Sequence, residues 1–233
     1  MKHFSNTYIF IFSSVMVIVV ATLLSLAATL LQPRQEKNLE IEKKKSMLES
    51  INISATAKNT EALYDKYIKE SFVINSKGEP VPGVDAFSVV LKIEQKKSLD
   101  KQFIPVFNAS PDDGEKVIIL PVEGKGLWGP IFGYVSLKAD MNTIYGVTFD
   151  HKGETPGLGA EINTTIFESQ FRGKKIFDND TFVSIGVIKG GTKPENLHGV
   201  DAISGGTITS KGLEKMLFDC ISKYNDFLLK NRH

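Results

Sequence analysis

The sequence predicts an α+β protein, in which a single N-terminal transmembrane helix precedes a mixed, largely antiparallel twisted sheet flanked by helices. Three observations support this fold class. An apolar run without charges covers residues 8–31, short β-branched segments separated by turn residues begin at Phe72, and an amphipathic pattern marks the C-terminal end. The sequence contains no internal repeat, so the sheet and its helices are expected to form one domain behind the span.

Residues 8–31 are long enough to cross a lipid bilayer. At ~1.5 Å per residue, a helix of this length spans the roughly 30 Å hydrocarbon core with some tilt. The alternative is a cleaved signal peptide, but its apolar region normally covers about 7–15 residues and ends in a small-residue cleavage site. The longer run is followed by LLQPRQEK, which offers no such site. We therefore expect a retained anchor behind a short tail over residues 1–7.

The charges around the span do not settle its orientation. Lys2 and His3 precede it, whereas Arg34, Lys37 and the lysine triplet at 43–45 follow it. The positive-inside rule, taken alone, would keep the larger part of the protein in the cytoplasm.

The rest of the chain divides into a linker and a domain. Residues 32–58 are charged and rich in good helix formers, which predicts a membrane-proximal helical linker, and residues 59–233 are expected to form the α+β domain. A helix is expected around Thr60 to Glu70. Strands are expected in FVIN, AFSVVLKIE, FIPVFNAS, KVIILPVEG, GYVSLKA, TIYGVTF and TFVSIGVIKGG, with GYVSLKA and TIYGVTF adjacent and antiparallel.

The C-terminal segment predicts an amphipathic helix that packs on the sheet. Apolar residues recur at intervals of three and four, at Leu213, Met216, Leu217, Cys220, Ile221, Tyr224, Phe227 and Leu228. The cysteine lies on this stripe, so we expect a small buried hydrophobe rather than a reactive thiol.

The composition excludes several kinds of site. The chain has 233 residues and a formal net charge of +1, whereas a nucleic-acid-binding surface normally shows a strong basic excess. The single cysteine, Cys220, excludes an internal disulfide and a multi-cysteine metal site. His3, His151, His198 and His233 are scattered singly. We therefore expect no nucleic-acid partner and no metal site.

Glycines and hydroxyl residues cluster directly before the last helix, in GVDAISGGTITS. The first turn of a helix leaves N–H groups without partners and carries partial positive charge. Phosphate is well accommodated there, especially where glycines such as Gly205 and Gly206 let the backbone approach closely. Taken by itself, however, the pattern is more often a turn followed by a helix cap.

Two other stretches could line a ligand. In HKGETPGLGAEI, residues 151–162, three glycines and a proline impose a shaped loop whose N–H groups suit the polar edge of an aromatic heterocycle. A simple long turn is the alternative, and the glycine spacing is not that of a dinucleotide fingerprint. In EGKGLWGPIFGY, Trp128 lies between glycines, where stacking on a ligand and burial in the core are equally compatible with the pattern.

Taken together and in order, GLWGPIFGYVSL, HKGETPGLGAEI and GVDAISGGTITS resemble the covalent FMN-binding domain family. Within it, they are most similar to the C subunits of sodium-translocating NADH:quinone oxidoreductases. The resemblance runs from the anchor to the last helix and is strongest over residues 124–217. It implies a covalent FMN-binding region over about residues 118–228.

The resemblance also implies the cofactor site. In that family the last threonine of a D-x-x-(S/T)-G-A-T pattern holds FMN through a phosphoester, and Asp201, Ser204, Gly205 and Thr207 match it, which makes Thr207 the flavinylated residue. Gly206 departs from the usual alanine but keeps its small volume. The remaining residues implied to bind the cofactor are Trp128 near the ring, Glu154, Thr155, Gly157, Leu158 and Gly159 along the flavin, and Lys189 near the phosphate. Thr209 and Ser210 are assigned to the helix entrance.

The implied function is electron transfer. The chain would be a subunit of a sodium-pumping NADH:quinone oxidoreductase, in which covalent FMN carries single electrons between other redox centres. It would have no NADH site and no catalytic residue of its own. The implied partners are the other subunits and a flavin transferase, and the implied location is the bacterial inner membrane, with the domain on the periplasmic side.

Two alternatives remain at this point. One is the G subunit of the related ferredoxin:NAD electron-transport complex, which shares the flavin-threonine motif. The other is a membrane-anchored assembly or binding protein without a cofactor.

Overall fold

The structure is a computed structural model that describes residues 5–232. Lys2, His3 and His233 lie outside the described residues, as does most of the predicted tail. The chain divides into two compact units, with the boundary between Lys43 and Lys44.

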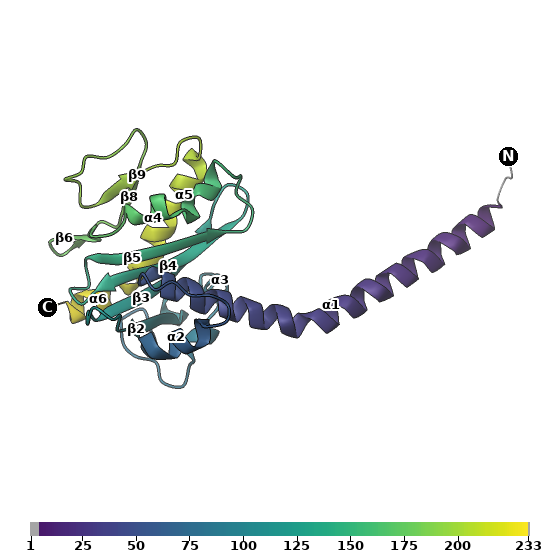
Figure 1. The fold of residues 1–233 in the computed structure, drawn as a ribbon, viewed down its shortest axis with the longest axis horizontal. Coiled ribbons are helices and arrows are strands. Elements are labelled where there is room, and N and C mark those ends of the chain that lie inside the picture. Colours follow the sequence, from purple (N-terminus) through teal and green to yellow (C-terminus); the bar gives the residue numbers. More distant parts are fainter. Residues whose placement is uncertain (1–4, 233) are drawn as a thin grey trace. The chain divides into compact units, whose positions relative to one another are not determined.

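Helix α1 (Asn6–Ser50) contains the apolar run and continues through Pro33 into the charged segment that follows it (Figure 1). Its most apolar window has a mean hydropathy of 2.7 and no buried residue, as expected of a lipid-facing span. The hydroxyls of Thr22 and Thr29 donate to the carbonyls of Ile18 and Ser25, at 2.8 and 2.9 Å. These bonds satisfy two polar groups within the apolar segment.

The centre of the second unit is a five-stranded sheet in the order β1-β2-β3-β4-β5 (Figure 1). All four pairings are antiparallel, which confirms the predicted sheet and the pairing of GYVSLKA with TIYGVTF. The strands are β1 (Ile68–Ile74), β2 (Ile104–Ala109), β3 (Val117–Lys125), β4 (Pro130–Lys138) and β5 (Ile144–His151). Two small two-stranded sheets follow: β6 (Phe177–Asp178) with β7 (Thr181–Phe182), antiparallel, and β8 (Gly186–Ile188) with β9 (Gly199–Asp201), parallel.

Helices cover both faces of the sheet. Successive side chains of β3 point to opposite faces, so Ile118 and Leu120 join one core cluster and Ile119 joins the other. The first cluster contains residues of α4 (Thr165–Ser169), α5 (Thr207–Ile221), the 3-10 turn η4 (Ser222–Tyr224) and α6 (Asn225–Asn231). The second contains Met47 and Leu48 at the end of α1, and Tyr67 of α2 (Thr60–Tyr67).

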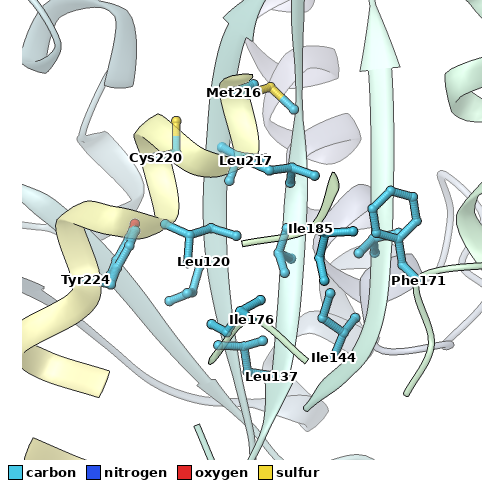
Figure 2. Close-up of a cluster of buried hydrophobic side chains, with 14 of the residues drawn as sticks. Leu120, Leu137, Ile144, Phe171, Ile176, Ile185, Met216, Leu217, Cys220 and Tyr224 are labelled. Carbon is cyan, nitrogen blue, oxygen red and sulfur yellow. The ribbon is translucent and has the colours of Figure 1, made fainter. Parts of the chain in front are cut away.

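The apolar stripe of the C-terminal segment is buried as predicted. Figure 2 shows Met216, Leu217, Cys220 and Tyr224 of this segment in one buried cluster with Leu120 and Leu137 of the sheet. All eight residues of the predicted stripe are buried. Burial raises the pKa of the Cys220 thiol, which fits a small buried hydrophobe.

Four predicted elements differ from the structure. AFSVVLKIE is not a strand but a 3-10 turn (η1, Ala86–Ser88) and a short helix (α3, Leu91–Glu94), because Asp85 caps Phe87 N and buried Glu94 accepts from Phe103 N. The helix that begins at Thr60 ends at Tyr67, since the next residues pair with β2.

TFVSIGVIKGG is likewise two strands rather than one. Ser184 has a φ of 60° and separates β7 from β8. The last amphipathic helix is also interrupted, by η4, where the Tyr224 hydroxyl donates to Pro105 O at 2.9 Å.

The carboxyl of Glu168 on α4 provides a pH-dependent contribution to stability. Burial raises its pKa to about 7, and the charges of Glu49 and Asp150 act in the same direction. The N–H of Phe149 donates to its Oε1 at 2.7 Å and opposes this shift. The folded-state pKa lies above the ordinary value of 4.5, so the folded state binds the proton more tightly. The free energy of unfolding contributed by Glu168 should therefore fall as pH rises from about 4.5 to about 7.

Replacing Glu168 by glutamine should remove this slope, because glutamine mimics the protonated acid and keeps an oxygen for Phe149. At pH 8 we expect the variant to be about 1–2 kcal/mol more stable than the wild type, a figure reduced for partial exposure. Urea unfolding between pH 4.5 and pH 8 measures the difference, with the exposed Glu195→Gln as control. A variant with the wild-type slope would contradict the assignment.

Candidate functional site

The amino end of α5 is fixed against the end of β3 by close backbone approach. A Cβ at Gly212 of α5 would overlap the carbonyl oxygen of Lys125. A Cβ at Gly124 would lie 2.7 Å from Met216 Cβ. No larger residue fits at either contact without a shift, so helix and strand meet through glycine. The first turn of α5 is therefore held beside the turn between β3 and β4.

Thr207 is the first residue of α5, and the backbone before it forms a tight turn. Gly205 has a φ of +72°, which favours glycine, and Gly206 N donates to Ile203 O at 3.1 Å. Gly206 is the N-cap residue and provides no side-chain oxygen for the N–H groups of the first helical turn. These groups and the helix dipole suit an anion. The start of α5 therefore lacks a side-chain cap, and phosphate binding there stays a prediction.

The hydroxyls around this turn differ in their environment. The Thr207 and Ser204 side chains are exposed, and no hydrogen bond of either hydroxyl is found within residues 5–232. Ser210 is buried, and its Oγ accepts from Ile203 N at 3.2 Å. Thr209 is buried and donates to Glu154 Oε2. Thr207 and Ser204 are therefore accessible to a ligand, while Thr209 and Ser210 hold the turn in place.

Glu154 links all three motifs that the sequence singled out. The residue is 5% exposed, and its carboxylate accepts from the Thr209 hydroxyl on α5 and from Trp128 N, the latter at 2.9 Å. Burial acts to raise the pKa of Glu154, but hydrogen bonds from Thr209 and from the N–H groups of Trp128, Gly129 and Leu127 outweigh it and lower the pKa. The side chain is thus ionised at neutral pH and oriented by protein donors.

Two glycines leave room for this carboxylate. A Cβ at Gly126 would lie 2.5 Å from Glu154 Oε1, and one at Gly159 would overlap both Oε2 and the Thr209 hydroxyl. The backbone N–H of Glu154 donates to His151 Nδ1 at 3.3 Å. The His151 contact was not foreseen from the sequence, although the histidine lies only three residues away.

The loop from Thr155 to Gly159 packs against the turn before α5. The Thr155 carbonyl accepts from Leu158 N and Ala160 N, both at 3.1 Å, and Gly157 has a φ of +73°. Leu158 lies so close to the turn that a Cβ at Gly205 would be 2.5 Å from its Cδ2. The structure therefore brings this loop and Ser204–Thr207 together.

Large apolar side chains are exposed around the same place. Trp128 is 70% exposed at the β3–β4 turn, Ile208 on the first turn of α5 is 59% exposed, and Leu127 and Leu158 are each 42% exposed. An exposed apolar group of this kind marks a surface for binding. The exposure of Trp128 excludes its burial in the core, and its stacking on a ligand stays a prediction. Ile208 was not among the sequence-predicted residues, because its exposure depends on how α5 packs.

Lys189 lies at a neighbouring strand end. Strands β8 and β9 are parallel, so Lys189 after β8 and Ala202 after β9 come to the same edge, and Ala202 N donates to Ile188 O at 2.9 Å. Asp201 Oδ1 accepts from Thr192 N at 2.6 Å and so holds the intervening turn. The Lys189 side chain is exposed, and no hydrogen bond ties it to the Thr207 turn within the described chain.

Comparison with known proteins agrees with this arrangement. The FMN-binding domain family matches residues 126–222, which contain the turn at Trp128, the 154–159 loop and the start of α5. The chain therefore has an FMN-binding domain behind one helix that fits a membrane anchor.

Relatives with the same architecture are more specific. The C subunit of the Na(+)-translocating NADH-quinone reductase from Parabacteroides distasonis has a crystal structure and is 43% identical, with a TM-score of 0.78 over 85% of this chain and 96% of that chain. NqrC of Shewanella oneidensis is 28% identical, with a TM-score of 0.70 over 82% and 97%. The C subunit of the Vibrio vulnificus reductase is 34% identical over 212 residues, covering 84% of this chain and 83% of its own. The chain belongs to the family of Na(+)-translocating NADH-quinone reductase C subunits.

Proposed function

We propose that this protein is the flavin-carrying subunit of a sodium-pumping NADH:quinone oxidoreductase, with FMN joined to Thr207 through a phosphoester. One observation carries the proposal. Thr207 is exposed at the start of α5, which has no side-chain cap, and Glu154 links this helix start to the Trp128 turn and to the 154–159 loop. The names of the relatives favour this function over the G subunit of the related ferredoxin:NAD complex and over a cofactor-free assembly protein.

The phosphate end of the site is formed by the start of α5. N–H groups of the first turn and the helix dipole stabilise the phosphate, and Gly205 and Gly206 let it approach the backbone. The Thr207 hydroxyl would supply the ester oxygen and lose its proton, and the nucleotide of an activated FMN donor would leave as the phosphoanhydride bond breaks. Lys189, at the adjoining strand edge, would supply a positive charge near the phosphate.

The ring end of the site is formed by apolar side chains. The bound flavin supplies one-electron redox chemistry, which no residue of the chain provides by itself. Trp128, Leu158 and Ile208 offer an exposed apolar surface for the isoalloxazine ring, and Thr155, Gly157 and Gly159 shape the loop beside it. Glu154 positions this loop and the Trp128 turn rather than contacting the flavin, because its oxygens face protein donors.

The membrane anchor fixes where this chemistry takes place. α1 fits a single-pass anchor, and we place the complex in the bacterial inner membrane, with the flavin domain on the periplasmic side. The charge distribution around α1 favours the opposite side, but large domains are translocated largely regardless of flanking lysines. The partners in this proposal are the other subunits and, during maturation, a flavin transferase.

The proposal is tested on the full-length chain in membranes, expressed with and without a flavin transferase. We expect FMN mass on the peptide containing Thr207 only when the transferase is present, together with flavin fluorescence of the denatured gel band. A periplasmic location predicts that a protease added to spheroplasts digests the domain. A matured chain without added mass on that peptide would overturn the assignment.

Replacing Trp128 by alanine should leave FMN attached, because the residue lies at the ring end and not at Thr207. We expect altered flavin absorption and fluorescence, because an indole stacked on the isoalloxazine ring perturbs its absorption and quenches its fluorescence. The spectra of the purified variant measure the change, with Leu99→Ala as a matched exposed apolar control. Identical spectra in wild type and Trp128→Ala would place the ring elsewhere.

A further inference from the structure

A groove of about 810 Å³ has a lining that includes none of the residues proposed to bind the flavin. One wall is the face of α5 that carries Lys215 and Asp219, and the other is the segment from Lys92 to Gln102. Its lining includes Gly129, the residue after Trp128, and Lys223 in η4, after the end of α5. The groove therefore adjoins the proposed flavin site at the Trp128 turn.

The groove is more basic than the chain as a whole. Four lysines line it, Lys92, Lys125, Lys215 and Lys223, against the two acidic residues Glu123 and Asp219, while the whole chain has a net charge of only +1. Lys215 is paired with Asp219 at 2.8 Å on the exposed rim. The other three lysines make no ion pair within the described part of the chain.

These positive charges are spread along the groove rather than gathered at one point. Lys125 lies beside Gly212 of α5, and Lys223 lies eleven positions further along this helical segment, or about 16 Å at 1.5 Å per residue. A single small anion cannot contact both. Carboxylates that far apart are roughly five residues apart in an extended chain at ~3.3 Å per residue. The spacing therefore fits an extended acidic segment.

We propose that this groove receives an acidic segment of a neighbouring subunit of the same complex. The inference rests on the proposed function, which places the chain in a multisubunit assembly. Charge complementarity of this kind directs association and fixes orientation. Because the groove adjoins the Trp128 turn, a segment seated in it holds the neighbouring subunit beside the flavin, as electron transfer between subunits requires.

Carbodiimide cross-linking of the intact, detergent-solubilised complex tests this directly, because the reagent joins only amines and carboxylates that are in contact. We expect amide cross-links from Lys92, Lys125 or Lys223 to aspartate or glutamate residues of another subunit. Cross-links from these lysines only to this chain, or to a second copy of it, would overturn the proposal.

Charge reversal provides a second readout. In the triple variant Lys92→Glu, Lys125→Glu and Lys223→Glu, we expect about tenfold less of the other subunits to co-purify with the chain. The matched control reverses Lys58, Lys77 and Lys116, which are exposed lysines outside the groove, and should co-purify within about twofold of wild type. Covalent flavin content and melting temperature should be unchanged in both variants, which shows that each one folds.

The outcomes separate the two proposals. A wild-type chain that carries covalent flavin and co-purifies with its neighbours, while the triple variant behaves like the control, overturns the groove assignment alone. A wild-type chain without flavin and without co-purifying subunits overturns the proposed function and this inference together.

Discussion

Replacing Thr207 by valine should abolish covalent attachment of flavin. Valine keeps the branched shape of threonine but removes the hydroxyl that would become the ester oxygen, so no phosphoester can form at this position. Because Thr207 is exposed and no hydrogen bond of its hydroxyl is found within residues 5–232, we expect the melting temperature to change little. The large effect is therefore on the cofactor and not on the fold.

Flavin fluorescence of the denatured band and peptide mass measure the Thr207→Val result. Thr207→Ser restores a hydroxyl at the same place and should recover part of the attachment, provided that the transferase accepts serine. Thr165→Val is the matched control, because it removes an exposed threonine hydroxyl from the first position of another helix, α4. Wild-type flavin content in Thr207→Val would place the ester on another residue.

Replacing Glu154 by alanine should loosen the whole site at once. The change removes the acceptor for the Thr209 hydroxyl and for the N–H of Trp128, and leaves these groups unsatisfied in a buried place. We expect a loss of about 2–4 kcal/mol in the free energy of unfolding, since bonds to a buried charged group are expensive to leave unmade. Because the pKa of Glu154 is lowered in the folded state, its ionised carboxylate adds to the free energy of unfolding at neutral pH. This contribution is lost as pH falls through the folded-state pKa.

Trp128 reports on this change specifically, because it is the only tryptophan of the chain. In Glu154→Ala the indole emission and its quenching by the attached flavin should change, and Glu154→Gln, which keeps one acceptor oxygen, should be intermediate. Glu161→Ala is the matched control, because it removes a carboxylate that accepts from Gly157 N in the same loop without reaching the Trp128 turn. Trp128 emission that responds equally to both alanine variants would mean that Glu154 has no specific role in positioning.

Much of this protein could be predicted from local pattern. The apolar run of residues 8–31 needs only its length and lack of charge to indicate a span, and the stripe from Leu213 to Leu228 needs only its helical period to indicate a buried face. Short β-branched segments also indicated the antiparallel sheet. These signals work because they depend on side chains that are neighbours within one element.

The predictions that were wrong concern segments with the composition of a strand whose backbone adopts another conformation in the fold. AFSVVLKIE has the composition of a strand, yet Asp85 and Glu94 satisfy backbone N–H groups locally and the segment becomes a turn and a short helix. The segment after Phe182 is interrupted at Ser184, whose positive φ ends the extended backbone. Tertiary packing selects these conformations, and propensity alone does not.

The sequence by itself determined the anchor, the class of fold and the order of the three motifs around Trp128, Glu154 and Thr207. Only the tertiary structure decided that Glu154 joins them, because its partners Trp128 and Thr209 are 26 and 55 residues away along the chain. It also decided which hydroxyls of the helix entrance are buried and which are exposed. Hydrogen-bond partners that are distant in sequence produce no periodic pattern in the sequence. They become neighbours only when α5 packs against the end of β3.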